Sequence, residues 1–109
     1  MQKWPQHVWL GASEKPYAYL VIPIGVPFEG AQLPANVIYA TRLPGEDEWE
    51  AIMIESVSGL DPMPMTHRSE TARALGATHV HVHPSAAGRD EEVADLRQRW
   101  LPRESAGDR

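Results

Sequence analysis

The chain contains no cysteine among its 109 residues, which excludes a disulfide framework, a thiolate zinc site and a cysteine nucleophile. It also lacks a long apolar stretch. The longest one, from Tyr17 to Val26, is about half as long as a membrane-spanning helix and is interrupted by Pro23 and Gly25. No charged segment followed by an apolar one begins the chain, so no signal peptide is predicted. We therefore expect a cytoplasmic protein that does not enter a membrane.

Two common site motifs are missing as well. No glycine-rich phosphate loop occurs, and no serine lies in a Gly-x-Ser-x-Gly turn. Basic residues are also scarce: 10 Lys and Arg stand against 15 Asp and Glu, which gives a net charge of −5. The acidic residues are densest at Glu46, Asp47, Glu48 and Glu50, a cluster that repels a phosphate backbone.

The composition predicts one folded domain. Hydrophobic residues make up 42% and charged residues 23% of the chain, as in ordinary globular proteins. Ten prolines predict short elements joined by stiff loops. We expect the domain to span residues 1–102 and to be followed by a disordered tail over residues 103–109, where small and polar residues prevail.

Local patterns predict an α+β fold with a small, mostly antiparallel sheet flanked by helices. Strands are predicted over residues 17–22, 37–41, 49–55 and 78–83, and the second and third of these form a hairpin across a Pro-Gly turn. Helices are predicted over residues 66–75 and 90–101, and Gly76 ends the first of them.

The second predicted helix is amphipathic. Acidic residues occupy its first turn and arginines its last turn, so its charges complement the helix dipole. Val93, Leu96 and Trp100 recur at helical spacing and are expected to cover a sheet. The same geometry places Glu92 at the border of the buried face and Glu91 in solvent.

A row of histidines is the most conspicuous chemical pattern. His79, His81 and His83 alternate with valines, so they share one face of a predicted strand. The outer two are about 13 Å apart, too far for one metal ion to bind all three. A histidine-based metal site is one hypothesis. Its ligands would be two neighbours on the strand, His79 and His81, together with His67 or His7. The alternative is an ordinary half-exposed strand.

Part of the chain resembles a known nuclease family. The segment Gly76-Ala77-Thr78-His79-Val80-His81-Val82-His83, the later pair Asp95-Leu96 and then Pro102 are similar to the C-terminal half of GIY-YIG nuclease domains. The order of hairpin, helix, strand and helix is similar too. The resemblance covers about residues 17–102, and residues 35–39 and 52–55 fall where the two motifs that name the family occur.

The resemblance implies metal-dependent cleavage of DNA, but the residues that carry it differ here. In the family a hairpin tyrosine activates water, a helix arginine contacts phosphate and a later glutamate binds the metal. Ile38 occupies the tyrosine position, and Met53 and Glu55 replace the second motif's tyrosine and glycine. No basic residue precedes Arg68 on the intervening segment, and Val93 stands at the glutamate position.

We therefore expect a catalytically inactive GIY-YIG-like domain that binds a partner protein in a regulatory or inhibitory role and needs no cofactor. Tyr39, Met53, Glu55 and Glu92 are predicted to wall its cleft. The acidic hairpin favours a basic partner, such as a nucleic-acid-processing protein.

The rival hypothesis is a small magnesium-dependent endonuclease with a rearranged site. Tyr39 would then act as the general base, His67 or Arg68 would contact the phosphate, and Glu92, next to the family's glutamate position, would bind the magnesium ion.

Overall fold

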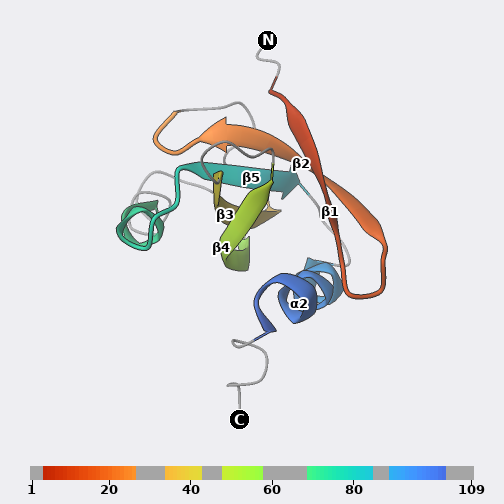
Figure 1. The fold of residues 1–109 in the computed structure, drawn as a ribbon. Helices are drawn as coiled ribbons and strands as arrows, with labels where there is room; N and C mark the ends of the chain where they lie inside the picture. The colour runs from red at the N-terminus through yellow and green to blue at the C-terminus, as the bar shows by residue number, and fades with distance from the viewer. Residues whose placement is uncertain (1–3, 27–33, 43–47, 58–68, 85–88, 103–109) are drawn as a thin grey trace.

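A computed structural model describes residues 4–26, 34–42, 48–57, 69–84 and 89–102 of the chain. A curled antiparallel sheet forms its centre, and α2 packs against one side of that sheet (Figure 1). The labelled elements in chain order are β1 (Gln6–Leu10), β2 (Pro16–Pro23), β3 (Ala35–Arg42), β4 (Trp49–Val57), β5 (His79–Pro84) and α2 (Arg89–Trp100). Residues 69–74 form a further short helix. The predicted α+β class is confirmed.

The sheet has five strands in the order β1-β2-β5-β3-β4, and every neighbouring pair is antiparallel. The predicted hairpin is present as β3 and β4, in which Tyr39 pairs with Met53 and a register shift follows Tyr39. Strand β5 lies between the two hairpins and pairs with β2 on one side and β3 on the other. This central position fixes which side chains of β2 and β3 meet the histidines of β5.

Strand β1 was not predicted from the sequence. It pairs with β2 through contacts such as Val8 with Ala18, and it forms one edge of the sheet. Only Trp9 of its five residues is buried, while Val8 and Leu10 are exposed. A strand of this length with one buried position gives a weak alternation signal.

Two groups of buried side chains occupy the two faces of the sheet. The first face carries Val37 and Tyr39 of β3 and Val80 and Val82 of β5, and the short helix covers it through Ala72. The opposite face meets α2, and its buried residues are Trp9, Tyr19, Ile38, Ala40, Ala51, Ile54, Val93 and Leu96. Adjacent residues of one strand therefore belong to different faces, as the two-residue period requires.

The short helix ends as predicted. Gly76 has φ 104°, in the left-handed region. The amide of Gly76 donates to the carbonyl of Arg73 at 2.9 Å, and the amide of Ala77 donates to that of Ala72 at 2.9 Å. This pair of hydrogen bonds is the Schellman motif, which satisfies the last carbonyls of a helix.

Several predicted features lie outside the described residues. They are the turn over residues 43–47, the segment over residues 59–65, the start of the first predicted helix, His67, Arg68 and the tail over residues 103–109. Among the described residues, no helix combines the length and apolar character needed to cross a lipid bilayer.

Candidate functional site

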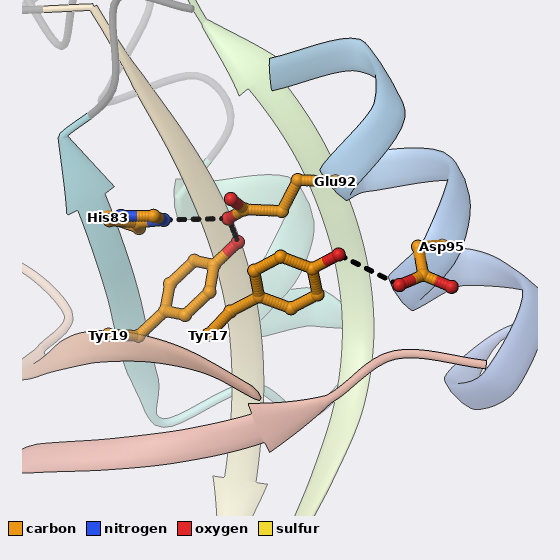
Figure 2. Close-up of polar contacts among 5 residues, drawn as sticks. All are labelled: Tyr17, Tyr19, His83, Glu92 and Asp95. Carbon is orange, nitrogen blue, oxygen red and sulfur yellow. Dashed lines mark hydrogen bonds and ion pairs between the residues drawn. The ribbon is translucent and has the colours of Figure 1, made fainter. Parts of the chain in front are cut away.

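A polar cluster lies between the sheet and α2. Its centre is Glu92, whose first-turn position on α2 turns the carboxylate toward the sheet, where only 8% of the side chain is exposed. The hydroxyl of Tyr19 donates to Oε2 of Glu92 at 2.5 Å, and Nδ1 of His83 lies 2.7 Å from the same oxygen (Figure 2). Glu92 was predicted at the border of the buried face, and that prediction is confirmed.

The strand period explains why these side chains meet. Tyr19 of β2 and His83 of β5 lie on the face that packs against α2, and their rings are 5.3 Å apart in an edge-to-face arrangement. The register of β2 against β5 pairs Leu20 with Val82, which places Tyr19 and His83 side by side. Helix α2 packs on this face and brings the Glu92 carboxylate to both side chains.

Two side chains share one carboxylate oxygen. When that oxygen accepts from both, Nδ1 of His83 carries the proton that points at Glu92. Burial and the hydrogen bond to Glu92 raise the pKa of Tyr19, which keeps its hydroxyl protonated as a donor. The cluster is therefore one acceptor oxygen held by two donors.

Asn36 of β3 adjoins this cluster without completing it. It pairs with His83 across the sheet and is fully buried. Its amide lies close enough to the Tyr19 hydroxyl to counter part of the rise in that pKa. Neither its Nδ2 nor its Oδ1 makes a hydrogen bond of good geometry.

A second carboxylate of α2 holds the turn between β1 and β2. Asp95 accepts from the Tyr17 hydroxyl at 2.8 Å and from the hydroxyl and the amide of Ser13 at 2.6 and 2.9 Å. The Ser13 hydroxyl contributes most to lowering the pKa of Asp95. Burial and the bond to Asp95 raise the pKa of Tyr17 to about 12. Asp95 thus anchors the N-terminal hairpin to the helix.

The walls of the cleft predicted from the sequence do not come together. Tyr39 is fully buried on the face opposite α2, and Met53 packs against the same group. Glu55 pairs with Val37, which also belongs to that face. Glu92 lies on the other side of the sheet. The prediction of one cleft is therefore wrong, because Tyr39 follows Ile38 by one residue and a one-residue step changes the face.

The endonuclease hypothesis pairs Tyr39 with Glu92, and these two residues lie on opposite faces of the sheet. A general base and a metal ligand must both reach one substrate, whereas a sheet lies between Tyr39 and Glu92. Glu92 is also already occupied by Tyr19 and His83. The residues proposed to contact phosphate, His67 and Arg68, lie outside the described part of the chain.

The histidine row is more deeply packed than predicted. His81 is fully buried, and its Nδ1 accepts a hydrogen bond from Nε1 of Trp9 at 2.9 Å. Burial, aided by His7 and His79, lowers the pKa of His81 to about 3. The expectation of a half-exposed strand is therefore wrong for His81. Within the described ranges, no group of three histidine or acidic side chains has a metal-binding arrangement.

Aromatic rings explain the burial of His81. The Trp49 ring lies 4.6 Å away edge-on, and the rings of Trp9 and His7 lie at 5.5 and 5.9 Å. Because Nδ1 is an acceptor in a neutral ring, Nε2 carries the proton. That nitrogen is buried, and the described residues offer it no nitrogen or oxygen atom as a hydrogen-bond partner.

The residues that sequence analysis missed are Tyr19, His83 and Asp95 in their actual roles. Each lies on a correctly predicted element, and alternation alone places Tyr17 with Tyr19 and His81 with His83. The missing information was that β2 and β5 are neighbours.

In comparisons with known proteins, no family model, no curated protein and no solved structure matches the chain.

Proposed function

We propose that this chain is a GIY-YIG-like domain that lacks nuclease activity and binds a basic protein partner. The observation that carries the proposal is the placement of Glu92. The best candidate for a metal-binding carboxylate is buried, accepts hydrogen bonds from Tyr19 and His83, and is separated by the sheet from Tyr39. A magnesium ion needs several oxygen ligands, and the described residues bring no second carboxylate into contact with Glu92.

The order of elements supports the scaffold part of the proposal. The hairpin of β3 and β4 is followed by a short helix, by β5 against β3, and by α2. The resemblance noted in the sequence has the same order. Strands β1 and β2 extend the sheet beyond it, on the far side of β5.

Charge and an open sheet edge support the binding part. The chain carries a net charge of −5, and the exposed residues Glu48 and Glu50 lie at the start of β4. Among the described strands, β4 has a neighbour on one side only. Arg97 covers part of its length, since two of its nitrogens donate to the Ile54 carbonyl at 2.6 and 2.9 Å. The first half of β4 is therefore the proposed contact, where acidic side chains favour a basic chain and disfavour a second copy.

Titration with a fluorescent Lys- and Arg-rich peptide tests this proposal, with an acidic peptide of the same length as the negative probe. Binding of the basic peptide should weaken with added salt and persist in EDTA. The charge reversal Glu50→Lys should weaken it by about fivefold. Glu70→Lys, which reverses an exposed charge on the short helix, should leave it near the wild-type value. A complex that needs a divalent ion, or an affinity for the basic peptide that Glu50→Lys leaves unchanged, contradicts the proposal.

A further inference from the structure

We propose that His83 is a nucleophilic site that accepts the acyl group of uncharged esters, with Glu92 as its positioning residue. The inference concerns metal-independent chemistry and does not rest on the proposed binding role. It starts from the contrast between the two nitrogens of one imidazole ring. Nδ1 of His83 is committed to Glu92 at 2.7 Å, whereas the described residues place no hydrogen-bonding group on Nε2.

The surroundings fix this ring in one orientation. Tyr19 packs edge-on against it with a centroid distance of 5.3 Å, and the Tyr19 hydroxyl also holds the carboxylate that holds Nδ1 (Figure 2). The side chain of His83 nevertheless stays 33% exposed. A carboxylate on Nδ1 fixes the tautomer in which Nε2 carries the lone pair. The arrangement therefore combines a ring held on one side with a side chain that is one-third exposed.

The chemistry balances with water as the only co-reactant. The Nε2 lone pair of His83 attacks the ester carbonyl, a C–N bond forms, and the C–O bond to the alcohol breaks as that oxygen leaves with the electron pair and takes a proton from water, which leaves a hydroxide ion. The resulting acyl-imidazolium is positive, and the Glu92 carboxylate at Nδ1 stabilises it. That hydroxide attacks the acyl carbon, and the C–N bond breaks with its electron pair returning to Nε2. The free imidazole, a carboxylic acid and an alcohol are the products.

Charge decides the substrate class. The first turn of α2, Arg89 to Glu92, carries one basic and three acidic residues, and its Glu92 carboxylate touches His83. Such a field repels an anionic phosphate ester. An uncharged ester avoids that repulsion, and the positive acyl intermediate gains from the same field. The site therefore fits neutral acyl esters rather than phosphodiesters.

The chain supplies its own matched control. His79 lies on the same strand and the same face as His83, and it is also partly exposed. Its Nδ1 lies 2.8 Å from the Thr78 hydroxyl instead of a carboxylate. If any accessible imidazole sufficed, His79 would react as well as His83.

Hydrolysis of p-nitrophenyl acetate by the full chain tests the proposal, with bis(p-nitrophenyl) phosphate as the anionic probe. We expect turnover of the acetate alone, loss of about 90% of that rate in His83→Gln and an unchanged rate in His79→Gln. Mass spectrometry of protein quenched during turnover should locate the acetyl group on His83. Equal rates in the wild type and His83→Gln, or an adduct on His79 instead, overturn the proposal.

The role of Glu92 needs a readout beyond rate, since removing a buried carboxylate also affects folding. In Glu92→Gln the ¹⁵N shifts of His83 should report a mixture of tautomers, and acetylation of the ring should slow by about tenfold. Asp95→Asn also changes a carboxylate of α2 but leaves the contact between His83 and Glu92 in place, so it should retain most of the rate and serve as the folded comparison. An unchanged tautomer and an unchanged acetylation rate in Glu92→Gln contradict the positioning role.

Discussion

Burial of His81 predicts that the domain loses stability in mild acid. The ring is fully buried, and its pKa is lowered to about 3, chiefly by burial and then by the neighbouring His7 and His79. In the unfolded chain a histidine takes up its proton near pH 6.5. Between these two values the unfolded state binds more protons than the native state. The stabilisation is therefore complete above about pH 6.5 and decreases as the pH falls toward 3.

The size of the effect follows from the difference between these two pKa values. At pH 5 the unfolded histidine is almost fully protonated and the native one is not, which costs about 2 kcal/mol at 1.36 kcal/mol per pH unit. Burial also lowers the pKa of His7 and His79, so these residues contribute in the same direction. A loss of this size is a substantial part of the stability of a small domain.

Urea unfolding followed by tryptophan fluorescence between pH 8 and pH 5 measures the effect. His81→Gln keeps an acceptor for Trp9 and removes the titrating ring, so its free energy of unfolding should vary by about 2 kcal/mol less across this range. His79→Gln should keep most of the wild-type slope. If wild type and His81→Gln show the same slope, His81 is not the buried neutral group described above.

Three further predictions concern the contacts of α2. Gly11→Ala should destabilise the domain by about 2 kcal/mol in urea unfolding, since a Cβ there would overlap the Asp95 carboxylate; an unchanged midpoint would contradict this close approach. Asp95→Asn should cost about 1–2 kcal/mol at pH 7 and less as the pH falls through the lowered pKa of Asp95, because the stabilisation is lost as the carboxylate is protonated; a pH-independent cost would refute the charged anchor. Tyr19→Phe should cost about 1–3 kcal/mol by leaving Glu92 with one partner, and thermal unfolding that matches the wild type would argue against their hydrogen bond.

Local patterns predicted most of the elements because each signal lies within one segment. The alternation of valine and histidine predicted β5, and the acidic start and basic end of α2 predicted that helix. Gly76 predicted the end of the short helix, since a positive φ suits glycine. Strand β1 escaped prediction because its single buried residue, Trp9, leaves no repeated pattern.

The site was only half predictable for a different reason. Helical spacing correctly predicted that Glu92 lies toward the sheet. Its hydrogen-bond partners, however, depend on which strands are neighbours. Nothing in the segment around Tyr19 indicates that β2 lies beside β5. The same limitation produced the wrong cleft: Tyr39 and Glu92 are each on a predicted element, and only the packing of α2 decides which face of β3 it covers. Strand pairing over long sequence separations is not encoded in local periodicity.

The carboxylate of Glu92 contacts Tyr19 and His83, and the proposed function holds that it therefore supports no metal-dependent cleavage of DNA. Incubation of supercoiled plasmid with excess protein, in magnesium and separately in manganese, tests it most directly. The account predicts that neither the wild type nor Glu92→Gln nicks the plasmid with either ion. Nicking by the wild type that Glu92→Gln abolishes would contradict it.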